Sequence, residues 1–346
     1  AEESFSVSFN CIHFQFSHPF QKKDEPYNLY SLKGTRLTDY SIDYGYTFRN
    51  LHLFGEWAMD QWSHAAIIQG ALISLGDNIS MSFLYRNISA AFQSLFSNAF
   101  TENSVPNNEK GFYSGISVRP ITGLQCDFYY DIYTFPWLKY QVDAPSSGRD
   151  FLFQAFYQPN KSWNLNVLYK NEMKTMNTTV SGSFTHGLVS PVKQRWRIAT
   201  DYIFSRAWSF NSRLEFAGIQ QNGFPTRHGY LGLTGFSYRK SGFSASIATA
   251  VFETDDYDTR IYAYEPDLLY RFSLPSFFGR GIHYYINIHQ DFSRLMGRGP
   301  RRFRISGWLK WGQTFYPGAM SIGTGLDEIP GNRKSEIRAE VLIQWQ

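Results

Sequence analysis

The chain has 346 residues, enough for one large domain or two ordinary ones, and a formal net charge of +4 that gives no indication of a nucleic-acid partner. Aromatic and charged residues each make up 18% of the chain. For a soluble protein the aromatic share is high and the charged share is low. The mean hydropathy is −0.35. No apolar run reaches the roughly eighteen residues of a membrane helix, which excludes a bundle of transmembrane helices.

The two cysteines, Cys11 and Cys126, provide neither a disulfide framework nor the spacing of a zinc site. We therefore expect no structural metal and no cofactor. The first three residues, Ala-Glu-Glu, fit either the mature end left by signal-peptide cleavage or a cut in a longer chain.

Apolar and polar residues alternate with a period of two along most of the chain, which predicts strands with one apolar and one polar face. We predict about seventeen such strands. In chain order their ranges are 4–11, 40–49, 51–60, 65–75, 79–86, 112–119, 124–133, 151–158, 163–172, 193–204, 208–216, 230–238, 243–252, 260–272, 282–291, 302–311 and 336–346. Tight turns and long polar loops alternate between them.

A sheet with these two faces fits either a soluble sandwich or a membrane barrel. Short turns that alternate with long loops are typical of periplasmic turns and extracellular loops. Tryptophan and tyrosine near strand ends are typical of an interfacial girdle, and a closed sheet has no free edge. We therefore predict an all-β fold, a transmembrane antiparallel β-barrel of about 16–18 strands. Bacterial barrels usually have an even number of strands, and the region 260–292 is the weakest assignment.

The last strand, 336–346, has the clearest pair of faces. Its apolar side chains alternate with charged ones, so we expect the apolar set to face lipid and the charged set to face the lumen. The predicted lipid-facing residues are Ile337, Val341, Ile343 and Trp345. Across all strands, the predicted lumen-facing polar residues are Lys193, Arg195, Arg197, Arg213, Glu215, His283, His289, Asp291, Arg302, Arg304, Lys310, Glu336, Arg338 and Glu340.

Several short motifs are distinctive when taken together. They are residues 26–30, 43–56, 98–103, 143–148, 252–255, 260–265, 274–281 and 325–332. With them the chain resembles the C-terminal β-barrel region of Bacteroidota outer-membrane helix-hairpin-helix domain proteins. The resemblance implies an outer-membrane location and passage through an oxidising periplasm. It also implies that a helix-hairpin-helix domain and further strands precede this region. It brings no settled activity and no catalytic residues.

Two groups of cations are candidate anion sites. Lys193, Arg195 and Arg197 form an inward row that would give a pore a preference for anions, or would be an ion-paired wall in a plugged lumen. The second group, Arg298, Arg301, Arg302 and Arg304, would bind an anionic solute, lipid A phosphates or a partner. The alternative for this group, which we favour, is a rim of charges paired with lumenal carboxylates such as Glu336 and Glu340.

The histidines invite an enzymatic interpretation that the spacing does not favour. His283 and His289 are six residues apart on one strand, roughly 20 Å at the rise of a strand, so they cannot share a metal. His289 and Asp291 are better explained as a lumenal hydrogen-bonded pair. No Ser-His-Asp arrangement of an outer-membrane hydrolase stands out. Two carboxylates in the loop 325–331 could hold calcium, but a structured turn accounts better for them.

Phe92, Phe96 and Phe100 lie four residues apart in the loop 87–110, so a helical turn would align them on one face. Exposed aromatic clusters commonly mark contact sites, and we predict that these three residues bind a partner. The alternative is that the rings fold inward and plug the lumen.

The sequence thus predicts one outer-membrane β-barrel domain over 1–346, multi-pass and the C-terminal portion of a longer chain. We expect no enzymatic activity. The favoured role is a membrane scaffold or subunit of a larger cell-envelope complex for assembly, secretion or uptake. The alternative is a passive or gated pore for a solute or polymer, and an outer-membrane hydrolase is the least favoured. Expected partners are outer-membrane lipid, lipopolysaccharide, and other envelope proteins or surface lipoproteins.

Overall fold

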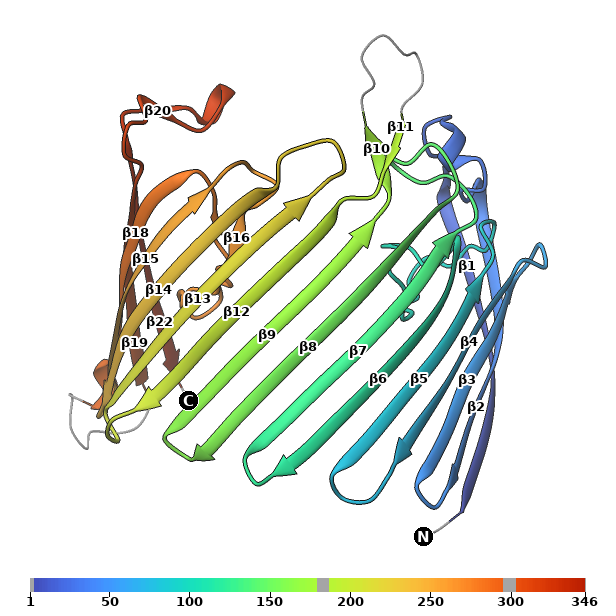
Figure 1. Cartoon of the computed structure of the whole chain (residues 1–346), viewed down its shortest axis with the longest axis horizontal. Coiled ribbons are helices and arrows are strands. Elements are labelled where there is room, and N and C mark those ends of the chain that lie inside the picture. Colours follow the sequence, from blue (N-terminus) through green and yellow to red (C-terminus); the bar gives the residue numbers. More distant parts are fainter. Residues whose placement is uncertain (1–2, 179–186, 295–302, 346) are drawn as a thin grey trace. The chain divides into compact units, whose positions relative to one another are not determined.

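The computed structural model describes residues 3–178, 187–294 and 303–345. Sixteen antiparallel strands form one sheet in chain order (Figure 1). They are β1 (Ser4–Phe20), β2 (Gly34–Phe48), β3 (Leu51–Asp60), β4 (Ala65–Ser74), β5 (Ile79–Ile88), β6 (Glu109–Ile121), β7 (Leu124–Phe135), β8 (Ser146–Asn160), β9 (Trp163–Lys174), β12 (Val192–Ile203), β13 (Trp208–Gln220), β14 (Arg227–Lys240), β15 (Phe243–Thr254), β18 (Arg280–Asp291), β19 (Phe303–Phe315) and β22 (Arg333–Trp345).

The remaining elements are short and lie in the connections. Three two-stranded pairs are β10 (Met176–Thr178) with β11 (Gly187–Val189), β16 (Ile261–Tyr262) with β17 (Ser276–Phe277), and β20 (Ser321–Ile322) with β21 (Ile329–Pro330). Three short 3-10 turns are η1 (Pro26–Asn28), η2 (Phe292–Arg294) and η3 (Gly325–Asp327). No helix among the described residues is long and apolar enough to cross a membrane.

One predicted strand is wrong. The range 260–272 does not join the sixteen-stranded sheet, because β15 pairs directly with β18. Within it, Ile261 and Tyr262 form the short strand β16, and Glu265 makes a single bridge to Ser273. Removing this strand from the predicted series leaves sixteen, an even number.

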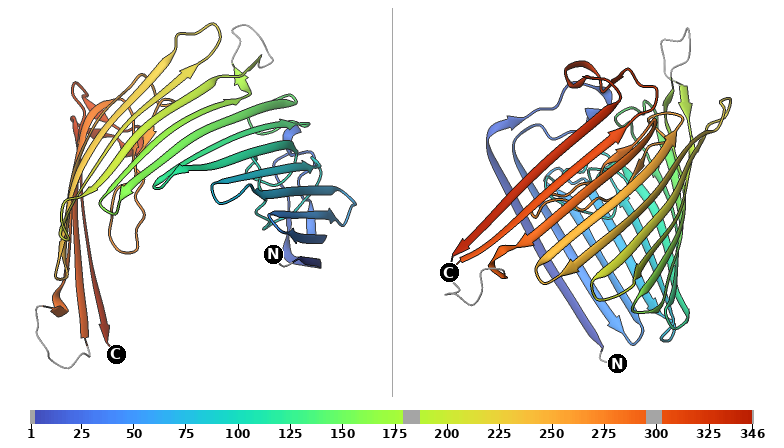
Figure 2. Two further views of the ribbon diagram at one scale, coloured as in Figure 1. Left: turned by 60° about the horizontal axis from the view of Figure 1, so that its bottom comes forward. Right: turned by 90° about the vertical axis from the view of Figure 1, so that its left-hand side faces the viewer.

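The chain divides into two compact units that we describe separately. The first unit comprises Ala1–Gln154, Lys170–Lys193 and Gln221–Phe224, and the second comprises Ala155–Tyr169, Gln194–Gln220 and Pro225–Gln346. Within the second unit, β18, β19 and β22 lie side by side in both views of Figure 2. Continuous pairing from Ile282–Phe315 to Asp291–Ser306 fixes the register of β18 on β19, and therefore which side chains share a face.

The sheet has an apolar face and a polar face. On β22, Ile337, Val341, Ile343 and Trp345 project from the apolar face and are all exposed, Val341 by 67%. Trp57, Ile198, Ile247 and Leu309 are exposed in the same way on other strands. The opposite, polar face carries Lys310, Arg338 and Glu215 among others. The predicted fold class, a transmembrane antiparallel β-barrel type of about 16–18 strands, is confirmed in strand number, pairing and faces.

In the first unit, the connection 89–108 folds back onto the polar face. Phe92 is only 4% exposed and packs with Ala66 of β4 and Ile88 of β5. Further along, the backbone amides of Glu102 and Asn103 donate hydrogen bonds to the carboxylate of Glu109 over 3.0 and 2.8 Å. Both ends of the connection are therefore held against the strands.

In the second unit, the connection 255–279 does the same; we call it the inner segment. Its apolar residues Ile261, Ala263 and Phe277 are buried in one cluster with residues of the polar face. The face contributes Ala217 of β13, Leu231 of β14, and Ala250 and Phe252 of β15. These four positions on the polar face are apolar, whereas a strand that faces water would carry polar residues there. The inner segment covers them and so removes their apolar surface from water.

Candidate binding cavity on the polar face

Two carboxylates anchor the inner segment beyond its apolar cluster. Glu265 accepts a hydrogen bond from His283 Nε2 of β18 over 2.8 Å and pairs with Lys310 of β19 over 2.6 Å. Asp267 pairs with Arg338 of β22 and lies 3.6 Å from Lys310. The segment is thus tied to three successive strands of the second unit.

These contacts keep Glu265 charged. Burial by itself raises the pKa of the Glu265 carboxyl, but the hydrogen bonds from His283 and Lys310 outweigh that effect and lower the pKa below its ordinary value. His283 is oriented from its other side, since Nδ1 lies 2.8 Å from the hydroxyl of Thr314. The anchor is therefore an ionised carboxylate held by two fixed donors.

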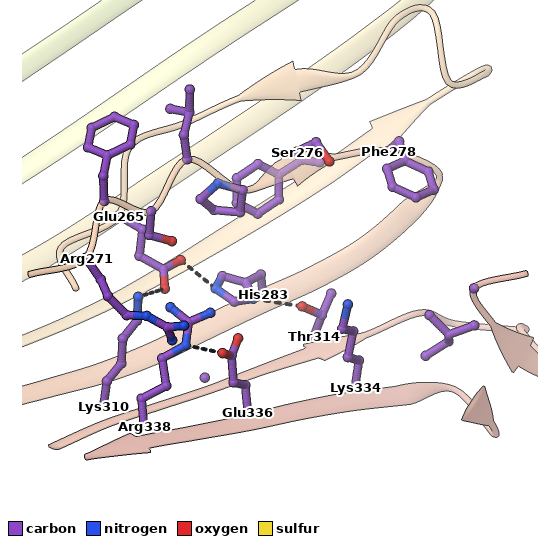
Figure 3. Close-up of a pocket in the computed structure, with 18 of the residues that line it drawn as sticks. Glu265, Arg271, Ser276, Phe278, His283, Lys310, Thr314, Lys334, Glu336 and Arg338 are labelled. Carbon is purple, nitrogen blue, oxygen red and sulfur yellow. Dashed lines mark hydrogen bonds and ion pairs between the residues drawn. The ribbon is translucent and has the colours of Figure 1, made fainter. Parts of the chain in front are cut away.

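A cavity of about 720 Å³ lies between the inner segment and the wall. Figure 3 shows Glu265 and Arg271 reaching it from the segment, His283 from β18, Lys310 and Thr314 from β19, and Lys334, Glu336 and Arg338 from β22. A volume of this size is within the range of small-molecule sites in proteins. The cavity therefore has the size of a small-molecule site, and charged and aromatic side chains share its lining.

Three arginines converge on one carboxylate elsewhere in the second unit. Glu215 of β13 has a fully buried side chain, and the guanidinium groups of Arg195, Arg197 and Arg213 pair with it, the first two at 3.3 and 2.7 Å. Arg213 also donates to the carbonyl of Tyr262 in the inner segment over 2.7 Å. Three cations and one anion leave the cluster with a net charge of +2.

The first unit has its own buried network. Arg86 of β5 is fully buried and donates to Glu109 of β6 over 2.5 Å and twice to Asp131 of β7 over 3.0 Å. Because Glu109 also accepts from the connection 89–108, the network joins three strands to that connection. Two carboxylates share one guanidinium here, so the network carries a net charge of −1.

The other predicted polar residues are placed individually. Lys193 and Arg304 are exposed, and Glu340 is half-buried. His289 stacks on Trp308 with ring centroids 4.5 Å apart, while Asp291 accepts from the Ser293 amide over 3.0 Å. Glu336 pairs with Arg338 on its own strand. Arg302, with Arg298 and Arg301, lies outside the described residues.

The three phenylalanines do not share one face, since 89–108 contains no helix. Phe92 is buried, whereas Phe96 is 78% exposed and its ring lies 5.5 Å from that of Phe14. Phe100 packs edge-on against Tyr113 at 5.2 Å, with the Arg86 guanidinium 5.6 Å from its ring. All three rings therefore contact groups of the polar face, since Phe14 lies on the same face of β1 as Asn10.

Sequence reasoning missed Glu265, Asp267, Arg271 and Lys334, of which all but Asp267 line the cavity. The first three lie in the range that was predicted to be a strand. One sequence signal indicates that a segment covers the polar face here. Four residues on that face, which is otherwise predicted to contact water, are apolar: Ala217, Leu231, Ala250 and Phe252. Among the described residues, no cluster of three or more metal-ligating side chains occurs. In the loop 325–331, Gly325–Asp327 forms the turn η3.

The apolar face places the protein in the outer membrane. Large exposed residues such as Trp57, Ile247 and Val341 recur along strands from both units, far more than a soluble surface exposes. In a bilayer this face contacts lipid hydrocarbon, so its apolar surface is not exposed to water. Strands cross membranes only in sheets of the barrel type, which in bacteria occupy the outer membrane. The chain is thus a multi-pass outer-membrane protein.

No family model and no curated protein matches the chain. Among solved structures it is similar to the loop L8 deletion mutant of OmpT, an outer membrane protein of Vibrio cholerae, at 9% identity over 99% of each chain, with a TM-score of 0.41. It is similar to the outer membrane channel DcaP of Acinetobacter baumannii at 6% identity over 79% of this chain and 94% of that chain, with a TM-score of 0.40. A third similar structure is OpdL of Pseudomonas aeruginosa, at 11% identity over 99% of each chain, with a TM-score of 0.39.

Proposed function

We propose that this protein is a non-enzymatic outer-membrane channel with a preference for anions. The observation that supports this proposal best is the surplus of positive charge on the polar face of the second unit, where Arg195, Arg197 and Arg213 share the one carboxylate of Glu215. Rings of arginine and lysine side chains select anions in pores. The ion pairs hold the three side chains in place, and the net charge of +2 remains available to a passing solute.

The inner segment and the connection 89–108 support a channel more than an open scaffold surface. Both fold onto the polar face and do not project from it. Segments in this position narrow the path that a solute takes and bring charged groups close to it. The rings predicted to bind a partner are partly used in this folding, since Phe92 is buried.

Planar-bilayer recording tests the proposal. Folded protein should give steady single-channel steps. In a KCl gradient, the reversal potential should be shifted from zero toward the equilibrium potential of chloride. Arg195→Gln with Arg197→Gln removes two cations from the cluster and should move the reversal potential toward the potassium side. Arg239→Gln with Lys240→Gln removes the same charge from the exposed end of β14 and should leave the reversal potential unchanged. Absence of conductance from demonstrably folded protein would refute the channel.

A scaffold role in a larger envelope complex is the second candidate. Phe96 in the first unit, and Met320 and Leu326 in the last connection of the second unit, are each more than three-quarters exposed. Exposed apolar side chains of this kind commonly mark contacts with other proteins, such as other envelope proteins or surface lipoproteins. A scaffold predicts copurifying proteins that are lost from a Leu326→Ser variant, together with no conductance.

A further inference from the structure

The cavity beside the inner segment contains two cations whose charge is not neutralised by a described side chain. Its lining includes the cations Arg271, Lys310, Lys334 and Arg338 and the carboxylates Glu265 and Glu336. Lys310 and Arg338 are paired with Glu265, Asp267 and Glu336. No described carboxylate pairs with Arg271 or Lys334.

These two cations approach the cavity from opposite sides. Arg271 belongs to the inner segment, and Lys334 lies near the start of β22 across the cavity in Figure 3. A guanidinium group presents paired N–H donors that match carboxylate or phosphate oxygens, and an ammonium group adds a point charge. An oxyanion between them would therefore be bound from two directions.

The rest of the lining suits a ring attached to that oxyanion. Arg271 is flanked in sequence by Tyr270 and Phe272, whose side chains are 75% and 77% exposed. Exposed aromatic rings offer flat apolar surfaces, and the hydroxyl groups of Ser273 and Ser276 add hydrogen-bonding partners nearby. A volume of about 720 Å³ exceeds what an inorganic ion fills and accommodates a sugar or a similar ring.

We propose that this cavity binds an organic oxyanion, a phosphate or carboxylate group attached to a sugar-sized ring, with Arg271 and Lys334 as its anion-binding residues. This proposal rests on the proposed channel function, for which it names the class of solute. Glu265 and Asp267 are positioning residues, because they hold the inner segment at the distance from β22 that creates the cavity.

Isothermal titration calorimetry on folded, detergent-solubilised protein tests the site without requiring conductance. The probes are glucose 6-phosphate, glucuronate and, as the uncharged control, glucose. At least one of the two anionic sugars should bind saturably, and glucose should bind about tenfold more weakly or not at all, since one charge-assisted contact contributes about 1.4 kcal/mol. If only one anion binds, the comparison identifies phosphate or carboxylate as the preferred group.

The double variant Arg271→Gln and Lys334→Gln should weaken anion binding at least tenfold. Neither side chain takes part in a described ion pair, so the variant should fold, which heat-modifiable migration on gels checks. The matched control Arg239→Gln with Lys240→Gln should bind the anions like the unmodified protein.

Three outcomes would overturn the proposed site: equal affinity for glucose and the anionic sugars, absence of saturable binding, or unchanged binding by the Arg271 and Lys334 variant. Conductance without binding overturns the site alone, and binding without conductance overturns the channel alone.

Discussion

Single buried charges determine much of the local structure of the first unit. Arg86 has no exposed side-chain surface, and its guanidinium group satisfies Glu109 and Asp131 together. A buried ion pair is weak evidence of net stabilisation, because desolvation offsets much of the attraction. Removal of one partner strongly destabilises the folded protein, because it leaves the other charges buried without an opposite charge.

Arg86→Met should therefore destabilise the protein by about 3–5 kcal/mol, because two buried carboxylates lose their shared cation. Urea unfolding in lipid vesicles, followed by tryptophan fluorescence, measures the free energy of unfolding. The control is Arg239→Met at the exposed end of β14, which should change it by less than about 0.5 kcal/mol. A loss below about 1 kcal/mol for Arg86→Met would contradict the assignment of this network as buried and ionised.

Lys139, in the connection between β7 and β8, provides a prediction on pH. Burial lowers the pKa of Lys139 to about 8, below its ordinary value of 10.5, and its ammonium group lies 3.4 Å from the centre of the Phe135 ring. Between pH 8 and 10.5 the unfolded chain binds more protons at this residue than the folded protein, so the free energy of unfolding rises with pH over that window.

Lys139→Met removes this titration. At pH 7 the variant should be the more stable protein, and its advantage should shrink as the pH approaches 10, because the unmodified lysine then loses its buried charge. Urea unfolding of both proteins across this range measures the difference. An advantage that stays constant with pH would show that the Lys139 pKa is not lowered by burial.

At the scale of elements, the last strand could be predicted from the sequence and the inner segment could not. The alternation in 336–346 predicts a strand with one apolar and one charged face, and 333–345 is the strand β22. In the inner segment, Ile261 and Ala263 also alternate with Tyr262 and Tyr264, so periodicity alone predicts a spanning strand. Its buried side faces the wall through non-local contacts, which a single sequence pattern does not contain.

The faces of β22 lead to a prediction for paired variants. Val341 is two residues from Ala339, the middle residue of the strand, and projects from the apolar face, whereas Glu340 is half-buried on the polar face. Val341→Arg should destabilise the protein by about 2–4 kcal/mol, the cost of an arginine near the bilayer midplane. Glu340→Gln should cost far less. Refolding yields and urea midpoints in vesicles measure both, and equal tolerance would contradict the assignment of faces.

At the scale of the whole molecule, the strand ranges and the membrane location followed from alternation, composition and turn spacing. These are local or averaged properties, and sixteen of the predicted ranges correspond to strands of the sheet. The candidate site depended on tertiary contacts instead. Lys310 and Arg338 were recognised as polar-face residues, but their partners Glu265 and Asp267 lie in a segment whose position only the structure determines.

The anchor of the inner segment also has a consequence for assembly of the protein. Asp267 lies 71 residues before its partner Arg338, which belongs to the last strand of the sheet. Asp267 is therefore synthesised well before its partner, and this one ion pair requires closure of a long loop. Until β22 has paired with β19, Asp267 lacks its partner Arg338, whereas Glu265 already has His283 and Lys310. The Asp267 end of the segment is therefore the part whose docking is completed last, when the final strand is in place.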